Sequence, residues 1–159
     1  MALCAWAKPT PPVLTPIPPL NERLLVDQTG SIDDYQAISL TSRLRSFPRD
    51  ERGQVAILLV PELRGETLEQ YSLRVAEVWR LGRARHDDGL LIVVLPSLPA
   101  ARLEVGYGLE GSIPDALAAR WLDELLPLIR EGRTVDGLVR LLDHIDGVLP
   151  PAKEKFNPD

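Results

Sequence analysis

The sequence has few of the residues that mark several common classes of protein. Its one cysteine, Cys4, cannot form an internal disulfide and has no second cysteine with which to build a zinc site. Aromatic residues make up 5% of the chain, too few for the stacking surfaces that bind single-stranded nucleic acid. The net charge is -5, with acids and bases interleaved, so no basic face is predicted. No apolar run approaches the roughly 18 residues of a membrane-spanning helix, so the sequence predicts neither a nucleic-acid partner nor a transmembrane segment.

The 159 residues, of which 45% are apolar, are enough for one domain with short tails. Residues 1–7 end in the small-x-small triplet Ala5-Trp6-Ala7, which is typical of the end of a secretory signal peptide and predicts export. An apolar terminus without a targeting role is the alternative. Residues 8–19 are rich in proline, which fixes φ and lacks an N–H, so they are expected to form an extended, stiff linker. The predicted domain covers residues 20–149, followed by a tail at 150–159.

Apolar runs and capping residues predict the element order β-α-β-α-β-β-α-α. The continuous aliphatic runs at 54–60 and 90–95 are typical of strands that are buried on both faces. Such strands need helices on both sides, so we expect an α/β fold: a three-layer α/β/α sandwich with a small mixed sheet of about four strands. The last two strands are joined by a turn too short for a parallel crossover and should form an antiparallel hairpin. The predicted strands are 24–26, 54–60, 90–95 and 102–105. The helices are expected to begin near Ser31, at Thr67, at Ser112 and Asp115, and at Thr134, and the first of them to end before Pro48.

Two adjacent carboxylates, Asp87 and Asp88, come directly before the predicted third strand. Carboxylates held close together repel each other, and a divalent cation with oxygen ligands relieves that repulsion. The hairpin would bring this loop close to Glu110. Asp27 would join the group only if the first strand ran antiparallel to the third, which the sequence leaves open. The alternative is that these acids form turns and solvated surface charges.

Two arginines, Arg83 and Arg85, flank the acidic residues. Guanidinium groups in such a position can bind an anion such as phosphate, but arginines also commonly balance neighbouring acids. Neither His86 nor His144 has a serine or cysteine partner in a recognisable nucleophile motif. The sequence therefore gives no assignment of a catalytic residue.

The segment 106–111 reads Gly-Tyr-Gly-Leu-Glu-Gly and has the G-x-G-x-x-G spacing of a dinucleotide site. A dinucleotide site requires a further strand after the following helix, whereas the rest of this chain predicts two helices. Glu110 would also repel a pyrophosphate, so no dinucleotide is expected. The glycines instead predict loop geometry that lets the backbone approach the acidic residues. The glycines assigned to loop geometry are Gly30, Gly89, Gly106, Gly108 and Gly111.

Several segments together resemble the TPM domain, a family with members in the thylakoid lumen, in bacterial cell envelopes and among accessory proteins of animal membrane receptors. The resemblance covers residues 20–149 and implies a Rossmann-like α/β/α sandwich and export to the periplasm or cell envelope. It also implies acidic loops that bind calcium or a similar ion such as magnesium or manganese. Carried over to this sequence, the metal ligands are Asp27, Asp87 and Asp88, with Glu110 as a weaker candidate. The matching segments are 26–30, 79–83, 87–91, 102–111 and 113–116.

Three functions are consistent with this resemblance. The first is a cation-binding accessory domain that acts on or with membrane-protein complexes of the envelope. The second is a weak, metal-assisted acid phosphatase, an activity proposed for plant members, with Arg83 or Arg85 orienting the phosphate. The third is an interaction domain that needs no metal. We expect the first, because no residue of the sequence has the position of an obvious nucleophile or general base.

Overall fold

A four-stranded sheet forms the centre of the computed structural model, which describes residues 9–151. Its strands lie side by side in chain order, with β1 parallel to β2, β2 parallel to β3, and β3 antiparallel to β4. The predicted mixed sheet and the antiparallel hairpin are therefore confirmed. The strands are β1 (Leu25–Asp27), β2 (Gln54–Leu59), β3 (Gly89–Leu95) and β4 (Ala100–Val105).

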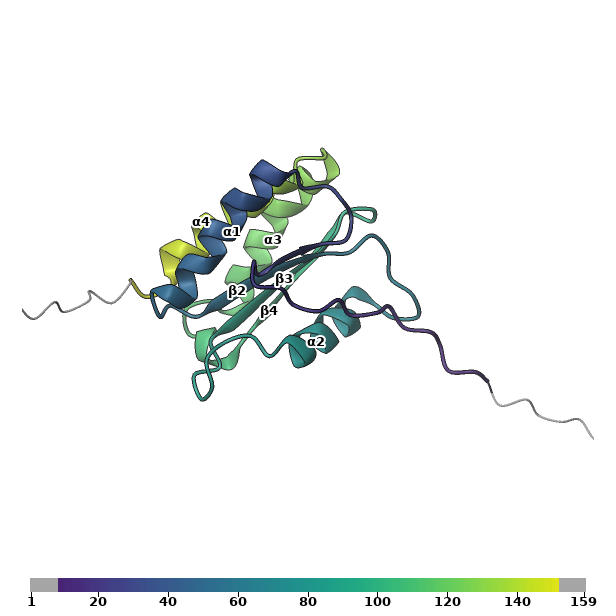
Figure 1. Cartoon of the computed structure of the whole chain (residues 1–159), viewed down its shortest axis with the longest axis horizontal. Helices are drawn as coiled ribbons and strands as arrows, with labels where there is room; N and C mark the ends of the chain where they lie inside the picture. Colours follow the sequence, from purple (N-terminus) through teal and green to yellow (C-terminus); the bar gives the residue numbers. More distant parts are fainter. Residues whose placement is uncertain (1–8, 152–159) are drawn as a thin grey trace, which may run out of the picture.

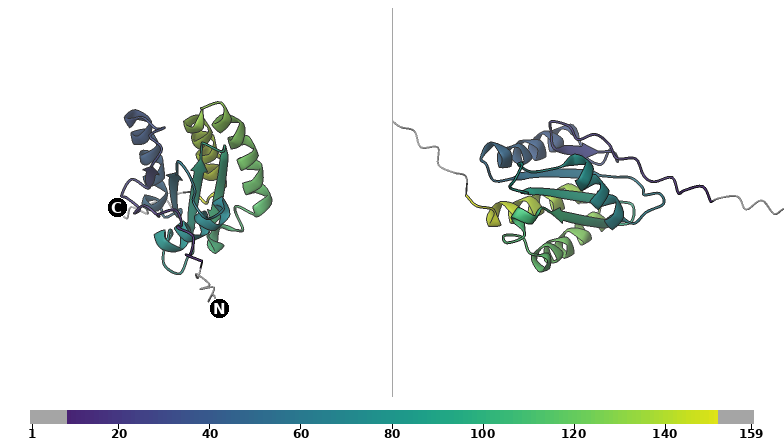
Figure 2. Two further views of the ribbon diagram at one scale, coloured as in Figure 1. Left: turned by 90° about the vertical axis from the view of Figure 1, so that its right-hand side faces the viewer. Right: turned by 90° about the horizontal axis from the view of Figure 1, so that it is seen from below.

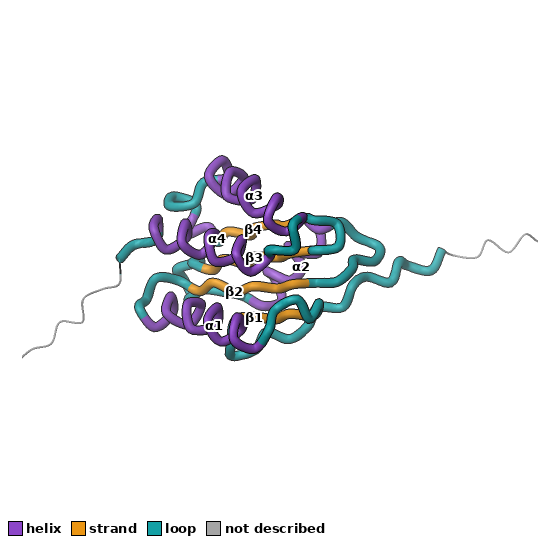
Figure 3. The backbone as a smooth tube through the Cα atoms, turned by 90° about the horizontal axis from the view of Figure 1, so that it is seen from above, coloured by secondary structure: helices purple, strands orange, loops and turns teal. Residues whose placement is uncertain are grey.

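Helices cover both faces of the sheet, which confirms the three-layer α/β/α architecture (Figure 1). Three helices lie on one face, where α1 packs on β1 and β2, α3 packs on β4, and α4 packs on α1 and α3 (Figure 3). The other face is covered by α2, which packs on β3 and β4 (Figure 2). Because both faces are covered, the aliphatic side chains of β2 and β3 are at most 2% exposed. The helices are α1 (Asp34–Arg49), α2 (Leu68–Trp79), α3 (Asp115–Arg130) and α4 (Thr134–Val148), with a 3₁₀ turn η1 (Tyr107–Leu109) after β4.

The two parallel connections of the sheet have opposite hands. Both the β1-α1-β2 and the β2-α2-β3 connections step across the sheet in the same direction. Their helices, however, lie on opposite faces (Figure 1). Right-handed crossovers are the rule because of the twist of the strands, so one of these two connections departs from it.

The helix ends differ in detail from the sequence prediction. Asp33, and not Ser31, caps α1, because its side chain accepts from the N–H of Gln36 while the Gln36 side chain accepts from the N–H of Asp33. The Ser31 hydroxyl is instead bonded to the Thr29 hydroxyl at 2.6 Å. Helix α1 also continues through Pro48, since the N–H groups beyond the proline still bond back into the last turn.

The three other predicted helix starts lie close to the observed ones. The capping box that was expected at Thr67 and Gln70 opens α2, and α4 begins at Thr134. Helix α3 begins at Asp115, one of the two residues expected to open it, and Pro114 is its N-cap, because the Pro114 carbonyl accepts from the N–H of Ala118 at 3.1 Å. Ser112, the other residue expected at this start, lies outside the helix.

The described part of the proline-rich segment, residues 9–19, forms no helix or strand and runs along the α2 face of the sheet (Figure 1). Between residues 15 and 18 its carbonyl groups accept hydrogen bonds from α2. The Tyr71 hydroxyl donates to the carbonyl of Pro16 at 3.2 Å, and the Trp79 indole donates to the carbonyl of Pro18 at 2.9 Å. These residues of the predicted linker therefore belong to the packed unit.

Several predictions fall on the chain ends that the structure does not describe. The signal-like residues 1–7, Cys4, and residues 152–159 of the predicted tail lie outside the described part of the chain. Within residues 9–151, no helix has the length and apolar character needed to cross a membrane.

Candidate functional site

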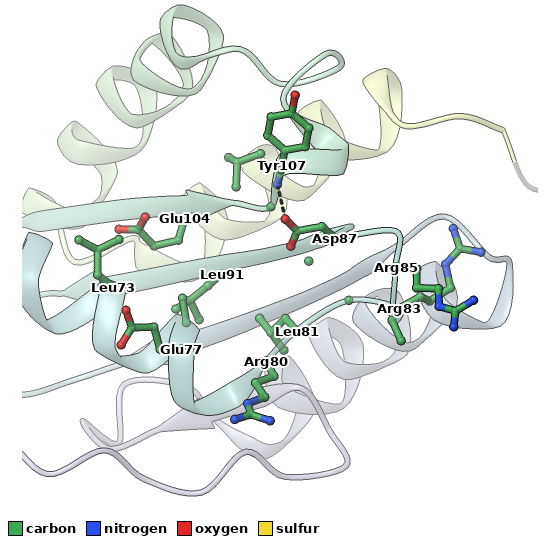
Figure 4. A pocket seen from close by; sticks show the side chains of 16 residues that line it. Leu73, Glu77, Arg80, Leu81, Arg83, Arg85, Asp87, Leu91, Glu104 and Tyr107 are labelled. Atoms are coloured by element: carbon green, nitrogen blue, oxygen red, sulfur yellow. Dashed lines mark hydrogen bonds between the residues drawn. The ribbon is translucent and has the colours of Figure 1, made fainter.

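The acidic loop, residues 86–88, lies beside the turn that follows β4. The Asp87 carbonyl accepts a hydrogen bond from the N–H of Gly108 at 2.9 Å. The Asp87 carboxylate accepts one from the N–H of Tyr107 at 3.2 Å (Figure 4). The hairpin therefore brings the acidic loop beside the glycine-rich segment, as the sequence predicts.

Two glycines allow this close approach. A side chain at Gly106 would overlap the carbonyl oxygen of Asp87, and one at Gly108 would overlap the carbonyl oxygen of His86. Gly89 is in similar contact with the backbone of Leu81. The other two glycines assigned to loop geometry lie apart from this contact, and an added methyl group would meet nothing within 4 Å at Gly30 or Gly111.

Asp88 is buried and paired with Arg83. Its side chain is 7% exposed and accepts from the Arg83 N–H at 2.7 Å, from Nε at 2.7 Å and from Nη2 at 2.7 Å. Burial raises the pKa of Asp88, but the hydrogen bonds and the charge of Arg83 outweigh burial and lower that pKa below its ordinary value. Asp88 is thus ionised and already bound by a protein cation. Conversely, the Arg83 guanidinium, which was proposed to bind an anion, is occupied by Asp88.

Asp27 and the acidic loop lie at opposite ends of the parallel strands. β1 is parallel to β2 and β2 to β3, so β1 runs parallel to β3. Asp27 ends its strand, whereas Asp87 and Asp88 precede theirs. The Asp27 carboxylate accepts from the N–H and hydroxyl of Thr29 and from the N–H of Ile32, so it holds the turn before α1.

The two other predicted site residues are exposed. Glu110 follows η1, and Arg85 is in the left-handed backbone region at φ 70°. In the part of the chain from residue 9 to residue 151, no three carboxylate, histidine or cysteine side chains are grouped as they would be around a metal ion. The four predicted ligands are therefore not brought together, and Asp87 is the one that faces a pocket.

A pocket of about 600 Å³ opens between the end of α2, the acidic loop and the start of β3 (Figure 4). Leu73, Leu81 and Leu91 give it apolar walls, while Asp87 and Tyr107 line it from the loops. The Tyr107 ring is 77% exposed. An apolar wall with a few polar groups at its rim is the usual composition of a binding site.

A network of polar side chains on strand β4 borders the same pocket. This network was not predicted from the sequence. Glu104 accepts from the Ser72 hydroxyl at 2.5 Å and from Arg102 Nε at 2.6 Å. Arg102 also reaches Glu69 of α2 at 3.4 Å. The alternation of charged and apolar residues along β4 is the signal that could have indicated it, because alternate side chains of a strand share one face.

Comparison with known proteins supports the resemblance seen in the sequence. No curated protein matches the chain. The solution structure of the N-terminal domain of a protein from P. gingivalis is similar, with 29% identity, a TM-score of 0.72, and coverage of 84% of this chain and 88% of that chain. The N-terminal domain of cg2496 from Corynebacterium glutamicum (11% identity, TM-score 0.65, 91% of each chain) shares the fold. So does the BA42 protein of Bizionia argentinensis (12% identity, TM-score 0.64, covering 83% of this chain and 93% of that chain).

The family model described as the TPM domain matches residues 25–148. This match spans all four strands and all four helices of the structure. The chain therefore belongs to the TPM domain family.

Proposed function

We propose that this domain is an accessory module of the cell envelope that binds a divalent cation, calcium in the first place, through Asp87. One observation carries the proposal: the Asp87 carboxylate lies exposed at the rim of the pocket, on a loop fixed by its bonds to Tyr107 and Gly108. Asp27 and Asp88 cannot bind the ion that Asp87 binds. Asp27 lies at the other end of the strands, and Asp88 is bound by Arg83.

The affinity of such a site should be low. Calcium takes roughly six to eight oxygen ligands, and of the predicted ligands only the Asp87 carboxylate lines this pocket, where no arginine or lysine of the described chain binds it. Most ligands would then be water. We expect dissociation constants of about 10⁻⁴–10⁻³ M, as in extracellular calcium modules.

The test compares Asp87→Asn with the wild type in thermal unfolding with calcium, magnesium, manganese or chelator. At about 10 mM, an ion with the expected affinity stabilises the folded state by about 1.4–2.7 kcal/mol, which raises Tm by about 3–10 °C. Asparagine keeps an acceptor for the Tyr107 N–H and tolerates the left-handed backbone at φ 48°, so the substitution removes charge alone. The variant should fold like the wild type and lose the response.

Asp123→Asn is the matched control, since Asp123 is an exposed aspartate of α3 and its loss changes the net charge equally. It should keep the response to the ion. If Asp87→Asn responds like the wild type, the ion binds elsewhere and the Asp87 site is refuted. If the wild type responds to no ion, cation binding is refuted and the metal-independent interaction domain becomes the favoured function.

A weak phosphatase is the alternative, and the same samples decide it. Arg80 and Arg85 line the pocket and could meet a phosphate, although Arg83 is already bound by Asp88. Turnover of p-nitrophenyl phosphate that requires the stabilising ion and is lost in Asp87→Asn would favour the enzyme.

Export to the envelope, proposed from residues 5–7 and from the family, is tested by N-terminal sequencing of the protein isolated from cell fractions.

A further inference from the structure

The outward face of α1 carries a stripe of exposed side chains that no other element of the described chain covers. Its members recur every three or four residues, so they lie along one side of the helix. Two large apolar residues begin the stripe: Tyr35 is 83% exposed and Ile38 is 68% exposed. Arginines end it. The α1 stripe consists of Tyr35, Ile38, Ser42, Arg45 and Arg49.

A groove of about 710 Å³ runs beside the basic half of the α1 stripe. Arg23, which precedes β1, adds a third guanidinium to its lining. Within residues 9–151, neither Arg23 nor Arg45 makes a salt bridge, whereas Arg49 contacts Asp50 at 3.1 Å. The hydroxyl oxygen of Thr41, also in the lining, is buried and has no hydrogen-bond partner in the described chain. The groove thus holds cationic and hydroxyl groups that are not used by the fold.

We propose that the α1 stripe and its groove bind an acidic segment of a partner protein. Apolar side chains of that segment would pack on Tyr35 and Ile38, and its carboxylates would bind Arg23 and Arg45. Charge complementarity supports this occupant, because Arg23, Arg45 and Arg49 line one groove of a protein whose net charge is -5, and the first two make no salt bridge in the described chain. A flat anionic membrane would leave the groove unfilled, whereas side chains inserted from a partner segment fill it.

The length of α1 sets the size of the segment. Its 16 residues make a helix about 24 Å long, a distance that about eight residues of extended chain also span. The α1 stripe lies in the layer opposite α2, whose end forms the Asp87 pocket, so this inference does not depend on the cation site.

The experiment titrates the isotope-labelled protein with an extended peptide of this length, which has leucine in one half and glutamate in the other. Chemical shifts of backbone amides report where it binds. We expect changes along α1 and near Arg23, and loss of binding for a peptide with lysine in place of glutamate. Arg23→Glu/Arg45→Glu should weaken binding by at least about tenfold, and Ile38→Ser should weaken it without any change of charge.

Arg120→Glu/Arg140→Glu is the matched control, because both arginines are exposed on α3 and α4 and the net charge changes equally. This control should change the affinity less than about twofold. The proposal is overturned if the two double variants weaken binding to the same extent, if the shift changes lie away from α1, or if no binding occurs. It is equally overturned if phosphatidylglycerol vesicles, and not the peptide, bind in a manner that depends on Arg23 and Arg45.

Discussion

Asp87 and Asp88 are neighbours in the chain with opposite surroundings. Asp87 is exposed at the pocket rim with φ at 48°, while Asp88 turns inward to Arg83 with 7% of its side chain exposed. An inward carboxylate that accepts several charge-assisted hydrogen bonds stabilises the fold, and an outward one is available to a ligand. We therefore expect Asp88 to affect stability and Asp87 to affect binding.

Asp88→Asn should lower the free energy of unfolding at neutral pH by about 1–3 kcal/mol, because Arg83 loses its charged acceptor. The ordinary pKa of an aspartate is about 3.9, and the pKa of Asp88 in the folded state lies below that value. The contribution of Asp88 is therefore complete above about pH 4 and is lost as the pH falls through its folded pKa. Thermal unfolding between pH 7 and pH 2 should show the Tm difference from the wild type shrinking in acid. A difference that stays constant over this range would contradict the assignment.

The sequence could predict an acidic loop but not which carboxylate is free. Asp87 and Asp88 are chemically identical, and the choice depends on the backbone turn that presents the Arg83 N–H to one of them. The Arg83–Asp88 pair does agree with the simpler reading of arginines that balance neighbouring acids. Asp27 was ambiguous for another reason, because strand direction was not fixed by any local pattern.

At the scale of elements, the β3–β4 hairpin and its loops form one interlocked unit. The N–H of Gly106 donates to the carbonyl of Gly89 at 2.7 Å, and the N–H of Gly108 donates to the carbonyl of Asp87. These contacts place backbone where a side chain would otherwise lie. The geometry of the acidic loop therefore depends on the glycine-rich segment.

Gly108→Ala should destabilise the domain by about 1–3 kcal/mol, because the new methyl group overlaps the carbonyl oxygen of His86, a backbone atom that cannot turn away. Gly111→Ala serves as the comparison, since a methyl group there meets nothing within 4 Å, and its effect should stay within about 0.5 kcal/mol. Urea unfolding of both variants measures the difference. Equal stabilities for the two variants would mean that the loops can separate at little cost.

Elements were more predictable than their ends and connections. The buried strands β2 and β3 and the capping box at Thr67 have strong local signals, and all three are present. The start of α1 was misassigned because Ser31 and Asp33 are both good caps, and only the reciprocal bond with Gln36 distinguishes them. The opposite hands of the two crossovers had no sequence signal at all.

At the scale of the whole molecule, the proline-rich segment supplies part of the cover on the α2 face. Its carbonyl groups accept bonds from Tyr71, Arg74 and Trp79 of α2. Thr15 is 7% exposed, and its N–H donates to Glu66, whose side chain is also bound by Arg74. Proline suits this place because it keeps the segment out of a helix or a central strand, so the carbonyl groups remain available to side-chain donors.

A truncated chain that begins at residue 21 should therefore be less stable than one that begins at residue 13. Removing residues 13–20 deletes the acceptors for Tyr71 and Trp79 and uncovers both rings, which should cost at least about 2 kcal/mol, or about 4–8 °C in Tm. The shorter truncation removes from the described chain only residues that are exposed, 9–12, and should leave Tm nearly unchanged. If both chains unfold at the same temperature, the segment is only a linker.

The strand order β1-β2-β3-β4 repeats the order in which a ribosome makes the strands. Each new strand can add to the free edge of the sheet as the chain emerges, and none has to be inserted between two strands that are already paired. With crossovers of one hand, α1 and α2 would cover the same face, and the other would stay open during synthesis. With crossovers of opposite hands, each face of the sheet is covered by a helix before β4 is made. The growing chain therefore exposes less apolar surface before α3 and α4 are synthesised.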